Sequence, residues 1–281
     1  MNFAKYHALG NDYLVFHSED FDRDLTPAQI RRICHRQCGV GADGILWTSI
    51  HPETRAYSLR VFNPDGSEAE KSGNGARIFS RFLWDLGYIN DEEIEIGTPG
   101  GAVGATVHRR GDQVTVRLGK ASFFSSRIPV TGPPREVLDE PIQAAGKSYR
   151  FSAVTLGNPH CVIVAPEVSR EETVSAGPVL ETDPRFPNRT NVQFVRIVDP
   201  SRIQIEIWER GAGYTLSSGT SSGAAAAVVN KLGLCGPKLQ VEMPGGEVAV
   251  EISPDFEVTL TGPVTSVCHG TLSAELLQTA K

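Results

Sequence analysis

The sequence predicts an α/β protein of the α+β type, made of two pseudo-symmetric domains that arose by internal duplication. Three observations predict this class. Short motifs of the first half recur in the same order in the second half. Each half has segments in which apolar and polar residues alternate, and each half has one helix-like segment that follows a Ser-Gly pair. We therefore expect each domain to be a mostly antiparallel sheet curled around one central helix, with the functional site in the interdomain cleft.

The repeated motifs lie at nearly constant distances along the chain. Leu9-Gly10-Asn11 recurs as Leu156-Gly157-Asn158, and Ser72-Gly73 recurs as Ser218-Gly219. Five such pairs are 143 to 147 residues apart and keep the same order. One duplication followed by a few small deletions would leave this pattern.

The length of 281 residues is enough for two ordinary domains. The last strand-like segment, near residues 263–272, is expected to cross back to the first domain. We therefore predict a first domain of residues 1–118 and 263–281, and a second domain of residues 119–262.

Strand-like segments occupy equivalent places in the two halves. Apolar and polar residues alternate at 57–62 and 114–118 in the first half, and at 203–208 and 247–252 in the second. This alternation is typical of strands with one buried face.

The two helix-like segments differ in which sides are apolar. Between Phe79 and Leu86, apolar residues recur at helical spacing, and Gly87 is placed to cap the C-terminus. Residues 223–232 are almost all Ala and Val and end before Gly233. A helix that is apolar on every side should be buried all round, as it would be inside a curled sheet.

Composition excludes several classes of partner. The net charge is −6 and there is no basic stripe, which argues against nucleic acid and against an anionic membrane surface. No run approaches the roughly 18 apolar residues that span a bilayer, and no secretory signal is recognisable, so we expect a cytoplasmic protein. The five cysteines are irregularly spaced and indicate neither a disulfide framework nor a metal site.

Two loops join a strand to a helix at equivalent places, residues 65–77 and 209–220, and each helix starts at Ser72-Gly73 or Ser218-Gly219. Glycines there free backbone N–H groups to face an anion, and the helix dipole adds partial positive charge. A Ser-Gly pair can also be no more than a helix cap. Because the feature occurs twice, and the second copy follows Glu209-Arg210, we interpret both loops as a site for a small anion.

Other motifs do not change this interpretation. Gly39-x-Gly41-x-x-Gly44 has the letters of a dinucleotide fingerprint, but a helix-like segment precedes it and a strand-like one follows. Gly219-Thr220-Ser221-Ser222-Gly223 has the letters of a hydrolase elbow, but a long loop separates it from the strand. His160 lies beside Asn158 at a strand start and aligns with Tyr13, and either a structural or a catalytic role is open to it.

Seven sequence blocks are spread over nearly the whole chain: Leu9-Gly10-Asn11-Asp12, Gly39-Val40-Gly41-Ala42-Asp43-Gly44, Asn63-x-Asp65-Gly66-Ser67-Glu68, Gly73-Asn74-Gly75-Ala76-Arg77, Gly157-Asn158-Pro159-His160, Asn191-Val192 and Glu209-Arg210-Gly211-Ala212-Gly213. Taken together, these blocks resemble the diaminopimelate epimerase family.

The resemblance implies an isomerase that needs no cofactor, in which two cysteines on opposite faces of a small amino acid invert its α-carbon. Ser72 and Ser218 stand at those two positions. With His160 and Glu209, they are the candidate catalytic residues. The family's conversion of LL- to meso-diaminopimelate is the reaction that the resemblance implies.

The resemblance also implies a set of substrate contacts. Glu209, with the main chain near Asn63, would bind the amino group at the reacting carbon. The distal carboxylate end would be held by Asn11, Asn63, Asn158, Asn191 and Arg210. The backbone N–H groups that would grip the α-carboxylate belong to Gly73, Asn74, Gly219 and Thr220. No metal is expected.

Serine in place of cysteine changes the expected chemistry. A thiol has a pKa near ~8.5, which a helix N-terminus lowers further, whereas a serine hydroxyl must be activated by a neighbour. Helix-end stabilisation of up to ~2 kcal/mol is worth under two pKa units and does not close that gap. Lys71 and Tyr214 also depart from the family pattern and are candidates for altered chemistry.

Three functions follow as hypotheses. The first is an epimerase of the diaminopimelate type, altered or weakened by the two serines. The second is a family member recruited for another isomerisation, a cyclisation or an elimination in a specialised pathway. The third is a non-catalytic binder of amino acids. In each case we expect a small amino acid or related carboxylate as ligand, and the resemblance suggests a homodimer.

Overall fold

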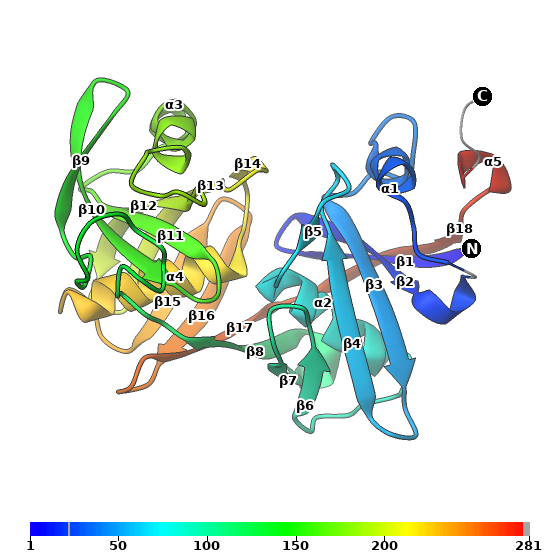
Figure 1. Ribbon diagram of the computed structural model, residues 1–281. Coiled ribbons are helices and arrows are strands. Elements are labelled where there is room, and N and C mark those ends of the chain that lie inside the picture. The colour runs from blue at the N-terminus through cyan, green and yellow to red at the C-terminus, as the bar shows by residue number, and fades with distance from the viewer. Residues whose placement is uncertain (22, 278–281) are drawn as a thin grey trace. The chain divides into compact units, whose positions relative to one another are not determined.

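The structure is a computed structural model that describes residues 1–21 and 23–277 (Figure 1). It has two compact units, Met1–Val116 with Gly262–Lys281, and Arg117–Thr261. The strands β8 (Gln113–Lys120) and β17 (Glu257–Pro263) each have residues in both units, so the chain passes from one unit to the other through them. The predicted class, α+β with two duplicated domains, is confirmed.

Strands arranged around one central helix form most of the first unit. The chain runs through β1 (Asn2–Ala8), β2 (Asn11–His17), α1 (Pro27–Cys34), β3 (Gly44–His51), β4 (Ala56–Phe62), β5 (Glu68–Ala69), α2 (Gly73–Asp85), β6 (Ile94–Gly97), β7 (Val103–His108) and β8, and returns as β18 (Thr265–Thr271) and α5 (Ala274–Leu277). Strand β1 lies between β18 and β2, β2 pairs parallel with β3, and β4 pairs parallel with β6.

The sheet of the first unit curls around α2, which packs against β1, β2, β3, β4 and β7 (Figure 1). Ser72 is the N-cap of this helix, and the apolar spacing of the sequence buries Ile78, Phe79 and Leu83. The chain leaves the helix at Gly87, whose φ of 73° is readily adopted by glycine, as predicted for the cap. Helix α1 covers the core that includes Phe16 and Trp47.

The second unit repeats this arrangement. It contains β9 (Glu140–Ala144), β10 (Lys147–Thr155), β11 (Pro159–Val164), α3 (Arg170–Glu181), β12 (Asn191–Asp199), β13 (Arg202–Glu209), β14 (Gly213–Thr215), α4 (Gly219–Lys231), β15 (Lys238–Met243), β16 (Gly246–Ile252) and β17. The parallel pairs β11–β12 and β13–β15 match β2–β3 and β4–β6 of the first unit, and the intervening pairs are antiparallel in both. Both units therefore have the same order of parallel and antiparallel strand pairs, as expected after a duplication.

Helix α4 is buried on all sides, as its composition predicted. Every residue from Gly219 to Val229 is buried. A Cβ added at Gly223 would lie 2.7 Å from Leu118 Cδ1 and 3.1 Å from both Leu156 Cδ1 and Val258 Cγ1, so only glycine lets these side chains approach the helix. The longest helices have 13 residues, and none in the described part of the chain is long and apolar enough to cross a membrane.

Candidate active site

In the first unit, the loop after β5 presents Ser72 at the start of α2. Ser72 is half-buried, and its Oγ accepts a hydrogen bond from the Gly75 N–H at 3.0 Å. A Cβ on Gly75 would lie 3.2 Å from Ser72 Cβ and 3.1 Å from Leu46 Cδ2, so glycine keeps the serine close to the helix. Because the Ser72 oxygen accepts this bond, its own proton is left for donation.

The residues after Ser72 are those that the sequence predicts to bind an anion. Gly73 and Asn74 are the first two residues of α2, and both are buried. The first N–H groups of a helix have no partner within the helix, and this helix has no acidic residue in its first turn. Lys71 lies half-buried just before Ser72. The predicted anion-binding residues are therefore together at this helix start.

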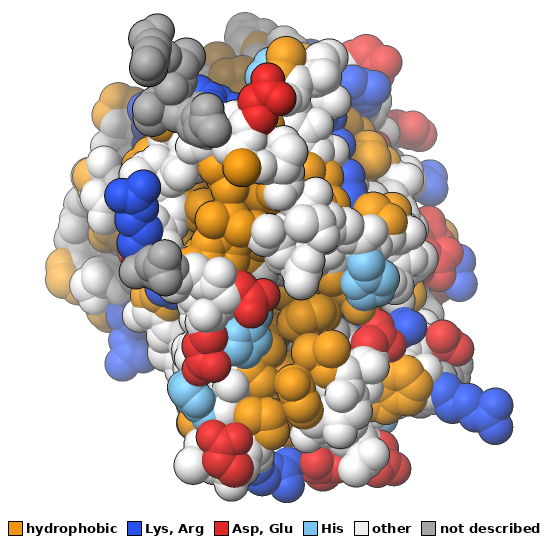
Figure 2. Space-filling model, turned by 90° about the vertical axis from the view of Figure 1, so that its right-hand side faces the viewer, with side chains coloured by type: hydrophobic (Ala, Val, Ile, Leu, Met, Phe, Trp, Pro, Cys, Tyr) orange, Lys and Arg blue, Asp and Glu red, His pale blue; other side chains and the backbone are white. Residues whose placement is uncertain are grey.

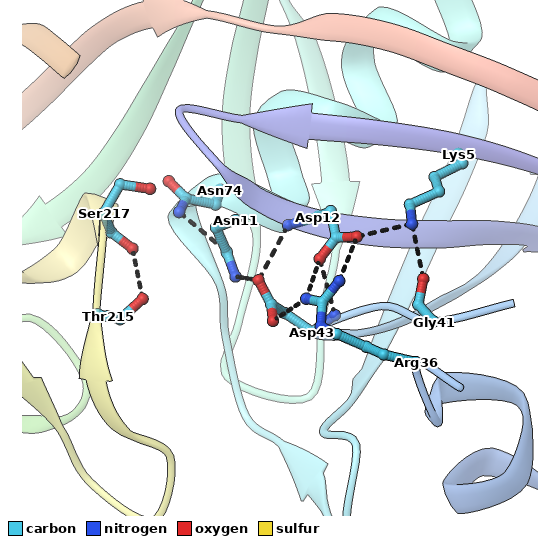
Figure 3. A network of polar contacts seen from close by, with 9 residues as sticks. All are labelled: Lys5, Asn11, Asp12, Arg36, Gly41, Asp43, Asn74, Thr215 and Ser217. Atoms are coloured by element: carbon cyan, nitrogen blue, oxygen red, sulfur yellow. Dashed lines mark hydrogen bonds and ion pairs between the residues drawn. The ribbon is translucent and has the colours of Figure 1, made fainter. Parts of the chain in front are cut away.

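Asn11 joins the same site from the start of β2. Its Oδ1 accepts a hydrogen bond from Asn74 Nδ2 at 3.0 Å, and its Nδ2 donates to Asp43 Oδ2 at 3.2 Å (Figure 3). Asn63 lies on the turn after β4, where its Nδ2 donates to Ser67 Oγ at 3.0 Å. The two asparagines predicted to bind substrate from this unit are thus already oriented by neighbouring side chains.

In the second unit, Ser218 is the N-cap of α4 and is only 4% exposed. Its Oγ accepts a hydrogen bond from the Ser221 N–H at 3.4 Å and donates to Glu209 Oε1 at 3.5 Å. Gly219 and Thr220 follow as the first two helical residues, both buried, and again no acidic residue lies in the first turn. A carboxylate therefore lies within hydrogen-bond distance of this serine hydroxyl and can accept its proton.

Asn191 connects the remaining polar loops of the second unit. Its Nδ2 donates to the Pro159 carbonyl at 2.9 Å, and its Oδ1 accepts from the Arg210 N–H at 2.9 Å. The parallel pairing of β11 and β12 brings these strand starts together, since His160 and Asn191 are partners in the ladder. The Arg210 guanidinium donates to the Asn188 carbonyl at 3.2 Å.

The loop that carries Glu209 and Arg210 is held by a carboxylate that sequence reasoning did not identify. Glu181, at the end of α3, accepts hydrogen bonds from Trp208 Nε1 at 2.7 Å and from the Gly211 N–H at 3.1 Å. The two donors, Trp208 and Gly211, are the residues directly before and after Glu209-Arg210 in the sequence. No local pattern in the sequence could have indicated Glu181, because its partners lie 27 and 30 positions away.

His160 is completely buried and accompanies Asn158. One ring nitrogen, Nε2, lies 3.0 Å from Asn158 Oδ1. Burial lowers the pKa of His160 to about 3, against a weaker opposing effect of the Gln193 side chain. Any role in the chemistry near neutral pH therefore belongs to the neutral imidazole.

Tyr214, on β14, contacts the carboxylate of Glu206 on the neighbouring strand β13. Its hydroxyl donates to Glu206 Oε2 at 2.7 Å, and the Arg170 guanidinium lies 4.9 Å from its ring centroid. Burial, together with Glu206, raises the pKa of Tyr214 to about 12. The phenol is therefore protonated at neutral pH.

Sequence comparison connects this geometry with known proteins. The sequence model of the family described as diaminopimelate epimerase matches residues 3–124 and 152–267. The chain belongs to the diaminopimelate epimerase family. Most of each matched segment lies in a different unit of the duplicated fold, and the resemblance of the sequence blocks to this family is confirmed.

Relatives within the family span the full chain. A protein named diaminopimelate epimerase 2, from Nostoc sp., is 52% identical over 276 residues, which cover 98% of this chain and 97% of the relative. The diaminopimelate epimerase of Moorella thermoacetica is 38% identical, with 96% and 98% covered. Both relatives carry the name diaminopimelate epimerase, and each is matched over nearly its whole length.

Solved structures show the same fold at low sequence identity. A hydroxyproline epimerase from Agrobacterium vitis has a TM-score of 0.72 at 16% identity, with 96% of this chain and 91% of that chain covered. A phenazine biosynthesis protein of the PhzF family from Bacillus anthracis has a TM-score of 0.68, also at 16% identity, with 96% and 98% covered. This fold therefore occurs in proteins with different names and different functions.

Proposed function

We propose that the protein inverts the α-carbon of diaminopimelate, without a cofactor, and that Ser72 and Ser218 occupy the two proton-transfer positions. The observation that carries this proposal is the matched pair of helix starts. Each has an N-cap serine, two buried residues that offer backbone N–H groups, and no acid in its first turn. Such helix ends bind carboxylates.

The two serines are proposed to have unequal roles. Ser218 donates its proton toward Glu209, so removal of the substrate α-proton by Ser218 Oγ is coupled to proton transfer onto the Glu209 carboxylate. The Ser72 oxygen accepts from Gly75, and its hydroxyl proton is available to the α-carbanion. In the reverse direction each proton retraces its path, and water restores the original protonation of both residues.

Both hydroxyls are far weaker acids than thiols, and the expected turnover is correspondingly slow. A positioned general acid or base contributes about 10²- to 10⁴-fold to a rate. Ser72→Cys/Ser218→Cys should therefore exchange the substrate α-proton at least about a hundredfold faster than the wild-type protein. The remaining contacts, from Asn11, Asn63 and Arg210 among others, are proposed to bind the substrate equally well in the wild-type protein and in the double cysteine variant.

The test is deuterium exchange at the α-carbon of diaminopimelate in D2O, followed by proton NMR. Exchange by the wild-type protein, lost in Ser72→Ala/Ser218→Ala, is the expected result. Absence of exchange in the wild type, while the double cysteine variant exchanges, would refute the proposal. Calorimetric binding without exchange would then identify an amino-acid binder, and product formation that survives in the alanine variant would identify a recruited enzyme.

The homodimer and the cytoplasmic location stay predictions. A second copy is proposed to pack on β18, where Val267 is 51% exposed and Cys268 is also exposed. The groove beside this strand has a volume of about 400 Å³ and is lined by Phe3, Val15 and Phe82 among other residues. Figure 2 shows a face on which hydrophobic side chains and histidines gather. A sedimentation mass of one chain, unaffected by Val267→Lys, would contradict the dimer.

A further inference from the structure

We propose that Asp43 and Arg77 are positioning residues that fix the side-chain amide of Asn11, so that it presents an N–H donor to the substrate's distal carboxylate. This proposal rests on the proposed function, which places Asn11 at that carboxylate. Neither Asp43 nor Arg77 is expected to touch the substrate. They act from the two ends of a chain of hydrogen bonds within the first unit, and Figure 3 shows the part of it from Asp43 through Asn11 to Asn74.

The carboxylate end of this chain determines how Asn11 is turned. An ionised carboxylate only accepts hydrogen bonds, and an asparagine amide has one accepting and one donating end. Asp43 Oδ2 lies 3.2 Å from the Asn11 side-chain nitrogen and 3.2 Å from the Asp12 N–H. A flipped Asn11 would bring its oxygen against the carboxylate oxygen, so Asp43 selects the orientation with Nδ2 toward it.

The guanidinium end determines how Asn74 is turned. A guanidinium only donates. Arg77 is completely buried, its NH2 group donates to Asn74 Oδ1 at 2.5 Å, and its NH1 group donates to the Pro263 carbonyl at 3.4 Å. Burial lowers its pKa to about 10, which keeps it charged at neutral pH. With its oxygen held by Arg77, Asn74 turns its Nδ2 toward Asn11.

The orientations that Asp43 and Arg77 select are compatible at the contact between Asn11 and Asn74. Asn74 Nδ2 donates to Asn11 Oδ1 at 3.0 Å, the orientation that Asp43 and Arg77 each select independently. The Asn11 oxygen is thereby occupied, and its nitrogen retains a second hydrogen. A carboxylate is attracted to that hydrogen, whereas an ammonium group is repelled by it. The chain of bonds thus favours a substrate with a carboxylate at its distal end over one with only an amine there.

Asp43 is itself held by a cluster of charges. Arg36 lies 2.6 Å from Asp43 Oδ1 and 2.8 Å from Asp12 Oδ1, and Lys5 lies 2.8 Å from Asp12 Oδ2. Lys5 also donates to the Gly41 carbonyl at 2.7 Å, in the loop that leads to Asp43. This cluster holds the Asp43 carboxylate in place from the side away from Asn11.

The experiment is a double-mutant cycle on the full-length protein, read by calorimetry with meso-diaminopimelate and with lysine, which lacks the distal carboxylate. Asp43→Asn should weaken diaminopimelate binding about tenfold or more, the usual scale for a hydrogen bond to a charged group, and change lysine binding little. In the Asn11→Ala background, Asp43→Asn should have no further effect on affinity. Asp255→Asn removes an exposed carboxylate paired with Lys120, and it should change neither the affinity for the two ligands nor the selectivity between them.

Additive effects of Asp43→Asn and Asn11→Ala, or equal losses for diaminopimelate and lysine, would overturn the proposal. The ligand-free protein gives a second readout. The Asn11 side-chain NH2 resonances in a nitrogen-15 spectrum should shift in both Asp43→Asn and Arg77→Lys, and unchanged resonances would also overturn it. If the wild type binds no diaminopimelate but these resonances shift as expected, the proposed function fails and the positioning chain stands.

Discussion

The clearest test of the charge cluster behind Asn11 is the replacement Asp12→Asn. Asp12 is only 8% exposed and is the partner of Arg36 and Lys5. Burial alone would raise its pKa, but the hydrogen bonds from Arg36 and Lys5 outweigh burial and lower the pKa from 3.8 to about 2. Each pKa unit corresponds to about 1.4 kcal/mol, so the ionised Asp12 contributes about 2 kcal/mol to the free energy of unfolding.

The sign of the pH dependence follows from the lowered pKa. In the unfolded chain Asp12 titrates near its ordinary value, so its contribution is present above about pH 4 and disappears as the pH falls toward about 2. Asp12→Asn should lower the free energy of unfolding at pH 7 by about 2 kcal/mol, and the difference from the wild type should shrink as the pH falls.

The assay is urea unfolding at several pH values, followed by tryptophan fluorescence, because Trp47 lies in the core of the first unit. The matched control is Asp255→Asn. Its carboxylate is 62% exposed and lies 3.4 Å from Lys120, a surface pair that should contribute little. Equal losses for both variants, or a loss in Asp12→Asn that does not depend on pH, would refute the reasoning.

Three further predictions follow from the site and its supporting helix. Glu209→Gln should slow α-proton exchange by about a hundredfold at saturating diaminopimelate, measured by NMR; an unchanged rate would remove Glu209 as the proton acceptor. Gly223→Ala should destabilise the second unit by about 1–3 kcal/mol in urea unfolding, because the added methyl would overlap Leu118; a loss below about 0.5 kcal/mol would contradict the packing described. His160 should show no titration by nitrogen-15 NMR between pH 8 and about pH 4, since burial lowers its pKa to about 3; a midpoint near 6.5 would contradict this.

The sequence allowed the duplicated fold to be predicted because its signals are local and occur twice. The Ser-Gly pairs before α2 and α4 are helix caps in both units, and the Ala- and Val-rich stretch indicated a helix buried on all sides. Apolar spacing before Gly87 likewise placed the end of α2. Each of these features depends on residues within about one or two helical turns of each other.

The interactions that orient the site depend on partners that are distant in sequence. Asp43 is 32 positions from Asn11, and Asn74 is 63 positions from it. Glu181 accepts hydrogen bonds from Trp208 and Gly211 and so holds the loop after β13. The Tyr214 hydroxyl donates to Glu206. Composition and spacing contain no information on which of many aspartates or glutamates meets a given amide, so these contacts could only come from the structure.

The central claim is that two serines support epimerisation, and the conversion of LL-diaminopimelate in D2O tests it most directly. The products are separated by chiral chromatography and weighed by mass spectrometry. The account predicts slow formation of meso-diaminopimelate with one deuterium at the inverted carbon, and a faster reaction in Ser72→Cys/Ser218→Cys. If the wild-type protein forms no deuterated meso product while the cysteine variant does, the serines do not support the reaction and the claim is wrong.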